Sequence, residues 1–179
     1  VVGSTGCGKS TTLAAMLQHR NEHISGHIIT IEDPIEFYLE SRKSVVNQRE
    51  LGLDAQSYPA ALKSALRSAP DVIMVGEIRD RETLAATLEL AGTGHLVMAT
   101  LHANSAPQTL DRIANFFAAE QHNQLFLDLS LYLRAVVSQR LVLGKTGHRL
   151  PAVEVMINTP YIAELVSKGQ FDKIKPAME

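Results

Sequence analysis

The feature that most constrains this chain lies at residues 3–10, which read GSTGCGKS. This stretch fits the phosphate-loop pattern G-x-x-x-x-G-K-[ST] at every fixed position. Glycine permits backbone conformations that a Cβ atom would forbid, so successive N–H groups can turn inward around a phosphate oxyanion. A helix expected at residues 11–20 would present its free amides and positive dipole end to the same anion. The motif therefore predicts a nucleotide site, against the alternative of a glycine-rich turn before an ordinary helix.

Each residue of this loop is expected to make its own contact with a nucleotide. We expect Lys9 to bridge the β- and γ-phosphates and the Ser10 hydroxyl to ligate Mg²⁺. Cys7 is expected to contribute its amide rather than its sulfur. ATP or ADP and Mg²⁺ are therefore the expected cofactors. The full expected nucleotide-binding set is Ser4, Thr5, Gly6, Cys7, Gly8, Lys9, Ser10 and Thr11.

Composition narrows the class of protein. A chain of 179 residues is long enough for one α/β domain with a real core. Its net charge of −2 and the lack of a basic stripe argue against nucleic acid as a partner. One cysteine excludes a disulfide framework and a four-cysteine zinc site. No apolar run approaches the roughly 18 residues of a membrane helix, so we expect a cytosolic protein without a transmembrane segment.

Apolar runs alternate with helical patterns along the chain. Strands are expected at residues 27–31, 45–48, 71–77 and 95–100, and at the sheet edge at 136–142 and 151–157. Helices are expected at residues 11–20, 57–68, 81–91, 106–117, 123–133 and 160–167. This alternation indicates a mostly parallel sheet with helices on both faces. Only two valines precede the phosphate loop, so we expect a truncated first strand and a longer parent protein.

Acidic side chains follow two of the expected strands. One strand runs directly into Glu32, Asp33 and Glu36, and another ends in Glu77. Ligands of open parallel sheets bind beyond the carboxyl ends of the strands, where these acids should meet. Hydrolysis of a phosphate bond needs a metal and a carboxylate that orients or deprotonates water. We expect Glu77 on the metal side, and Glu32, Asp33 or Glu36 as the base.

Two histidines flank the strand expected at residues 95–100. His95 begins this strand, and six residues at about 3.3 Å each place it roughly 20 Å from His102. His102 is therefore the better candidate for contact with the nucleotide. The alternative for either residue is a purely structural histidine.

Three further blocks resemble the secretion and type IV pilus ATPases, a type II secretion protein E-like family of P-loop motors that work as hexameric rings. Residues 29–37, ITIEDPIEF, look like the aspartate box of the family. Residues 66–80, LRSAPDVIMVGEIRD, resemble its atypical Walker B signature, and residues 93–102, TGHLVMATLH, its histidine box. With the phosphate loop, these blocks keep the family's order over more than half of the chain.

The resemblance implies a RecA-like P-loop NTPase fold and Mg²⁺-dependent ATP hydrolysis. By resemblance, Glu36 is the water-activating carboxylate, Ser10 and Glu77 hold Mg²⁺, and His95 and His102 are the box histidines. Including His95 goes beyond the geometric argument, which favoured His102 alone. The resemblance also implies that residues 1–179 are a C-terminal ATPase domain, with an N-terminal PAS-like domain outside this chain.

The chain lacks the four-cysteine zinc insertion usual in pilus assembly and type II secretion members, and so resembles the retraction branch, of PilT and PilU type. Residues 161–168, YIAELVSK, lack both arginines of the matching PilT-type segment AIRNLIRE, and with residues 129–142 look more like PilU. A motor for pilus retraction in twitching motility is therefore expected. The alternative is a nucleotide-binding accessory subunit that hydrolyses little and supports a PilT-type motor. A small P-loop kinase is disfavoured, because no arginine-rich lid is visible.

The same resemblance implies the partners and the location. The full-length protein is expected to form a homohexamer and to act with a PilT-type retraction ATPase and the inner-membrane pilus platform protein. Its expected place is the cytoplasm, peripheral on the inner face of the cytoplasmic membrane at the pilus base.

Overall fold

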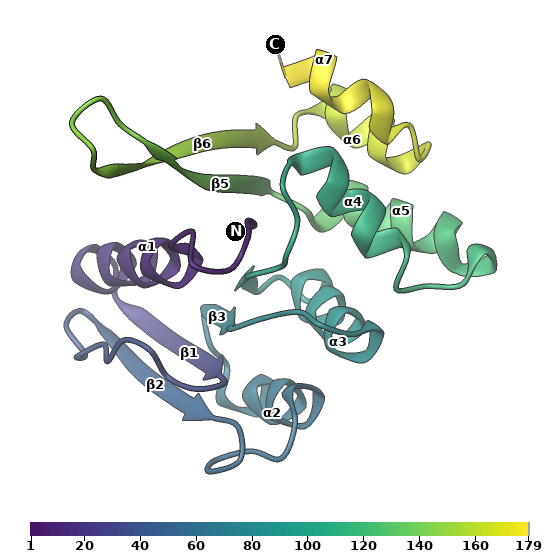
Figure 1. Cartoon of the computed structure of the whole chain (residues 1–179). Coiled ribbons are helices and arrows are strands. Elements are labelled where there is room, and N and C mark those ends of the chain that lie inside the picture. Colours follow the sequence, from purple (N-terminus) through teal and green to yellow (C-terminus); the bar gives the residue numbers. More distant parts are fainter. Residues whose placement is uncertain (179) are drawn as a thin grey trace. The chain divides into compact units, whose positions relative to one another are not determined.

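A computed structural model describes residues 1–178, which form two compact units (Figure 1). The sheet unit is Ser10–Thr100. The hairpin unit joins Val1–Lys9 to the chain from Leu101 onward. Both units combine strands with helices, so the predicted α/β class is confirmed.

The sheet unit is built on four parallel strands in the order β2-β1-β3-β4. The central strands, β1 (Gly26–Glu32) and β3 (Val72–Val75), are almost entirely buried. They read as continuous apolar runs because both faces of a parallel sheet are covered. The outer strands are β2 (Ser44–Glu50) and β4 (Leu96–Ala99), whose side chains are more exposed.

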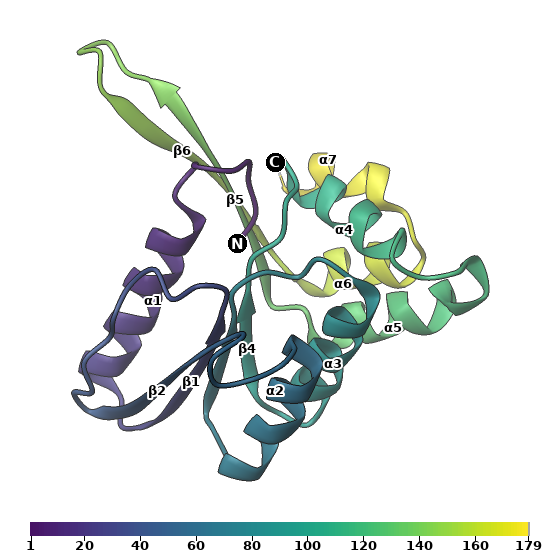
Figure 2. The ribbon, with the colours of Figure 1, turned by 60° about the horizontal axis from the view of Figure 1, so that its bottom comes forward.

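Helices cover both faces of this sheet, as predicted. The helix α1 (Lys9–His23), nearly all of it in the sheet unit, lies on one face. The helices α2 (Tyr58–Ala65) and α3 (Arg81–Gly92) lie on the other (Figure 2). The chain crosses from β2 to β3 and from β3 to β4 in the same direction, so right-handed crossovers place α2 and α3 on the same face.

The hairpin unit departs from the prediction of two strands at the edge of the parallel sheet. Its strands β5 (Ala135–Leu143) and β6 (Arg149–Ile157) pair with each other as an antiparallel hairpin. Gly147 lies in the connecting turn with φ +80°, a conformation that suits glycine. Val2 forms parallel bridges with Ser138 of β5 and with Leu101. The short segment before the phosphate loop is therefore extended, as expected of a strand.

Four helices complete the hairpin unit: α4 (Ala106–Ala114), α5 (His122–Tyr132), α6 (Pro160–Ser167) and α7 (Ile174–Met178). The predicted positions of the first three are confirmed, although α4 ends three residues earlier than expected. The short α7 was not predicted, because five residues carry too little periodicity; Ile174 is nevertheless fully buried. Within residues 1–178, no helix has the length and apolar character that crossing a bilayer requires.

Capping side chains set the start of several helices. The Asp80 carboxylate accepts a hydrogen bond from the Thr83 amide at 2.7 Å, at the first turn of α3. Similar caps come from Ser57 for α2, Ser105 for α4 and Thr159 for α6. Each cap satisfies an amide that has no partner within its helix.

We expect Asp80→Ala to lower the free energy of unfolding by about 1 kcal/mol, because the Thr83 amide loses its acceptor. Urea unfolding followed by circular dichroism measures this loss. Asp111→Ala is the matched control, since Asp111 is an exposed residue within α4. Equal stability of the Asp80 variant and the wild type would contradict the capping role.

Candidate functional site

The phosphate loop has the backbone geometry of an anion site. Gly6 and Gly8 have φ values of +75° and +91°, in the left-handed region that favours glycine. The loop leads directly into α1, which begins at Lys9 and has no acidic residue in its first turn. The positive dipole end of this helix therefore has no carboxylate in its own first turn to neutralise it, and it favours a negative charge nearby. These features fit the phosphates of a nucleotide.

A glutamine of β5 supports this loop from within the hairpin unit. The side chain of Gln139 is buried, and its Nε2 donates a hydrogen bond to the Cys7 carbonyl. A Cβ atom added to Gly8 would lie 2.9 Å from the same Nε2. Gly8 is therefore required both by its φ value and by the close approach of Gln139. No local signal in the sequence identifies Gln139, because it lies 132 residues from Cys7.

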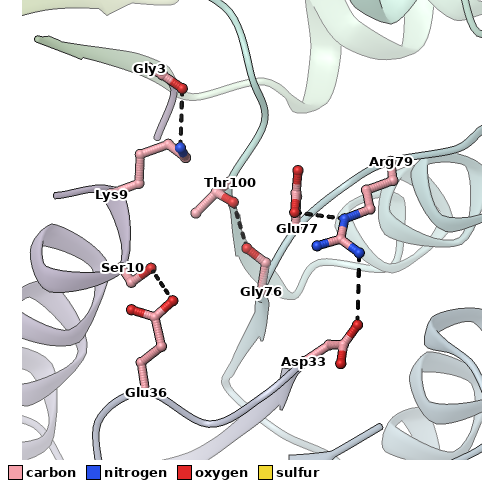
Figure 3. Close-up of polar contacts among 9 residues, drawn as sticks. All are labelled: Gly3, Lys9, Ser10, Asp33, Glu36, Gly76, Glu77, Arg79 and Thr100. Carbon is pink, nitrogen blue, oxygen red and sulfur yellow. Dashed lines mark hydrogen bonds and ion pairs between the residues drawn. The ribbon is translucent and has the colours of Figure 1, made fainter. Parts of the chain in front are cut away.

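The Lys9 side chain folds back over the loop. Its Nζ donates to the Gly3 carbonyl oxygen at 3.1 Å (Figure 3). It also donates to the Ser4 carbonyl oxygen at 3.1 Å. These carbonyls are neutral, so the two contacts hold the ammonium in place without cancelling its charge. Hydrogen bonds from an ammonium to an ionised phosphate are stronger than those to a carbonyl, so phosphate oxygens would be the preferred partners.

The predicted metal ligand and the predicted base meet in the sheet unit. The Ser10 hydroxyl donates to Glu36 Oε1 at 3.0 Å (Figure 3). Glu36 is exposed and lies in the loop between β1 and β2. A hydroxyl at the start of α1 and a carboxylate 26 residues later are therefore in direct contact.

Glu77 follows β3 after Gly76 and pairs with an arginine. Arg79 Nε donates to Glu77 Oε2 at 2.7 Å, and Arg79 Nη1 lies 3.8 Å from Asp33 Oδ2 (Figure 3). The hydrogen bond to Glu77, together with its negative charge, raises the pKa of the Arg79 guanidinium. The Gly76 carbonyl in turn accepts from the Thr100 hydroxyl. Glu77 therefore lies at the carboxyl end of the central strands, where the acids were predicted to gather.

No three His, Cys, Asp or Glu side chains cluster as a closed metal site in residues 1–178. Mg²⁺ is usually held by one or two protein oxygens together with substrate phosphates and water. Ser10 and Glu77, the residues predicted to hold Mg²⁺, each carry an oxygen of the type that such a site uses.

His95 lies at the end of the parallel strands opposite to Glu77. The parallel register pairs Val72 with Leu96, so His95 is level with Asp71 at the amino ends of the strands. Glu77 lies beyond the opposite ends, a span of six residues or about 20 Å along a strand. The Nδ1 atom of His95 faces the Thr93 hydroxyl at 3.0 Å.

His102 belongs to the hairpin unit, which also contains residues 3–9 of the phosphate loop. The amide of the preceding residue, Leu101, donates to the Val1 carbonyl at 3.2 Å, two residues before the loop begins. The two predicted box histidines therefore lie in different units of the chain, and His102 shares its unit with residues 3–9 of the loop.

Tyr58 is a buried residue that no sequence motif indicated, and its hydroxyl lies close to Gly76, the residue before Glu77. Tyr58 is 9% exposed, and a Cβ atom added to Gly76 would be 3.0 Å from its hydroxyl oxygen. Burial, and then the charge of Asp33, raises the pKa of Tyr58 to about 12.

We expect the stability of the protein to fall as the pH rises from 10 to 12. In this window the unfolded state releases the Tyr58 proton while the folded state keeps it. The contribution of the protonated Tyr58 to stability is therefore complete below pH 10 and is lost progressively as the pH rises to 12. Urea unfolding at pH 9 and pH 11 should differ by about 1.4 kcal/mol more in the wild type than in Tyr58→Phe. Tyr161→Phe, at a residue 58% exposed, is the control. The same pH dependence in Tyr58→Phe would show that another group is responsible.

Comparison with known proteins places these features in a family. The model of the family described as type II/IV secretion system protein matches residues 1–159. The type IV pilus ATPase PilU of Pseudomonas aeruginosa is 52% identical over 179 residues, which cover 99% of this chain and 47% of that protein. PilT of the same organism, also named a type IV pilus ATPase, is 48% identical over 179 residues, covering 100% of this chain and 52% of PilT.

Solved structures agree with this assignment. A crystal structure of the pilus retraction motor PilT with bound ADP superposes with a TM-score of 0.94 at 45% identity. The match covers 99% of this chain and 52% of that one. The predicted P-loop, RecA-like class is thereby confirmed. The chain spans about half the length of the relatives it matches.

The resemblance inferred from the four sequence blocks is also confirmed, including its pilus retraction branch. The chain belongs to the type II/IV secretion system protein family.

Proposed function

We propose that this chain is the C-terminal, ATP-hydrolysing domain of a type IV pilus retraction motor of the PilT and PilU kind. The reaction is ATP and water to ADP and phosphate. The observation that carries the proposal is the hydrogen bond from the Ser10 hydroxyl to Glu36. Ser10 directly follows Lys9, the lysine of the phosphate loop. The likeness to PilT with bound ADP supports it.

Binding of the nucleotide relies on the loop and the start of α1. Amides of the loop surround the β-phosphate, and the Lys9 ammonium exchanges its two carbonyl partners for phosphate oxygens. Ser10 and Glu77 would hold Mg²⁺, which supplies neutralisation of the phosphate charge. The proposed binding residues are Ser4, Thr5, Gly6, Cys7, Gly8, Lys9, Ser10 and Thr11.

Glu36 is the proposed general base. Its carboxylate is exposed and is held at the start of α1 by the Ser10 hydroxyl, so it can orient a water molecule and accept its proton. Glu32 is a poor candidate, because its side chain is buried and its Oε1 accepts the Thr30 hydroxyl at 2.6 Å. His102 is proposed to contact the nucleotide, and His95 to take the second histidine role of the family.

Assembly and partners follow from the same proposal. The full-length protein would form a homohexamer on the cytoplasmic face of the inner membrane. Its partners would be a PilT-type ATPase and the pilus platform protein. An N-terminal PAS-like domain would account for the remaining length of the relatives.

Lys9→Ala in the full-length protein should lower ATP turnover by several orders of magnitude and weaken ATP binding, because the phosphates lose their lysine contact. Phosphate release, measured beside hexamer content, tests this. Lys9-dependent turnover that rises with hexamer content supports an autonomous motor. Tight binding without turnover, until a PilT-type ATPase is added, supports the accessory subunit instead. Turnover that does not depend on Lys9 would refute the proposed site.

Glu36→Gln should keep the affinity for ATP nearly unchanged and reduce turnover by roughly two to four decades, as expected for loss of a general base. Equilibrium binding and steady-state kinetics on one preparation separate the two effects. Glu40→Gln is the matched control, since Glu40 is an exposed acid of the same loop that pairs with Arg42. Unchanged turnover in Glu36→Gln would transfer the base role to another acid.

A further inference from the structure

The loop that carries Glu36 has unusual support. Residues 33–43 connect β1 to its parallel neighbour β2 without forming a helix or strand. Parallel neighbours are normally joined through a helix, which satisfies its own backbone groups. An irregular crossover must find other partners for its amides and carbonyls. In this loop, side chains of the sheet unit provide several of them.

Gln48 of β2 contacts the loop at two points just after Glu36. Its Nε2 donates to the Phe37 carbonyl at 2.9 Å, and its Oε1 accepts the Leu39 amide at 2.7 Å. One carboxamide therefore fixes the backbone immediately after the proposed base. Only a side chain that carries both a donor and an acceptor can make this pair of contacts.

A buried carboxylate anchors Gln48 itself. Gln48 Nε2 also donates to Glu32 Oε1 at 3.1 Å, and the same oxygen accepts the Thr30 hydroxyl at 2.6 Å. The register of β1 and β2 pairs Thr30 with Gln48, so these side chains share one face of the sheet. Thr30 is fully buried and Glu32 is 7% exposed, which fixes the anchor within the core.

Two further side chains hold the outer parts of the loop. Glu50 Oε2 accepts the Ile35 amide at 2.9 Å. Asn21 of α1 donates to the Glu40 carbonyl at 2.7 Å and accepts the Arg42 amide at 2.9 Å. Gln48 holds the stretch of the loop between Ile35 and Glu40, through Phe37 and Leu39.

We propose that Gln48 is a positioning residue, which, anchored on Glu32, holds the loop of residues 33–43 so that the Glu36 carboxylate stays beside Ser10. The inference rests on the proposed ATPase function, in which Glu36 is the base. It gives Glu32 the role of an anchor, distinct from that of Glu36. Loss of the carboxamide would leave the chemistry of Glu36 intact but its position less well defined.

The test uses Gln48→Leu in the full-length protein, with Gln56→Leu, at an exposed residue of the same unit, as control. We expect kcat to fall by about 10- to 100-fold, the cost of a small misplacement of a catalytic group, with KM for ATP changed less than about 2-fold. Amide hydrogen exchange should accelerate over residues 35–39, and at Leu39 above all.

Combination with Glu36→Gln separates positioning from a general loss of stability. If Gln48 acts through Glu36, Gln48→Leu causes little further loss of kcat in the Glu36→Gln background. An equal fold-loss in both backgrounds, or wild-type kcat in Gln48→Leu, would overturn the proposal. If the leucine variant does not fold, Gln48→Glu serves instead; it keeps the size but loses the donor and places a second carboxylate beside Glu32.

The hydrogen-exchange measurement keeps this inference separate from the proposed function. A wild-type protein without Lys9-dependent turnover would refute the ATPase proposal. Unchanged exchange at Leu39 in Gln48→Leu would refute the positioning role, whatever the activity of the protein.

Discussion

The local structure at the start of the chain depends on the backbone conformation of the phosphate loop. Gly6 and Gly8 adopt positive φ values that other residues reach only with strain. This conformation places the start of α1 at Lys9, which folds its ammonium back onto the loop carbonyls. It also brings the Cys7 carbonyl to Gln139 of β5. A side chain at Gly8 would disturb both the loop and its contact with the hairpin.

The central strands supply the second constraint. Because β1 and β3 are buried on both faces, they hold the backbone leading to Glu32 and Glu77 firmly. Charged groups can follow such strands only where they reach solvent or find partners. Glu77 finds Arg79, and Glu32 finds Thr30 and Gln48. The apolar core and the charged site are therefore consequences of the same strand arrangement.

Those parts of the structure that depend on neighbouring residues were predictable from the sequence. The phosphate loop, the strands of the sheet unit and most of the helices carry short-range patterns, and they lie where those patterns placed them. The hairpin at residues 135–157 was assigned to the sheet edge, because its apolar runs do not reveal which strand each will pair with. Gln139, Gln48 and Tyr58 were missed for a related reason. Their importance comes from contacts with distant segments, and a lone glutamine or tyrosine has no distinguishing neighbours in the sequence.

The three acids of the stretch EDPIE show how the fold separates residues that their side-chain chemistry alone leaves equivalent. Glu32 is the last residue of β1, and its strand register turns it toward Thr30 and Gln48, into the core. Asp33, just outside the strand, lies within reach of the exposed Arg79. Glu36, three residues farther, extends from a loop whose backbone is held from β2, and it meets the Ser10 hydroxyl. All three carry a carboxylate, so the end point of β1 determines which of them is buried, which lies near a cation and which stays exposed beside a hydroxyl.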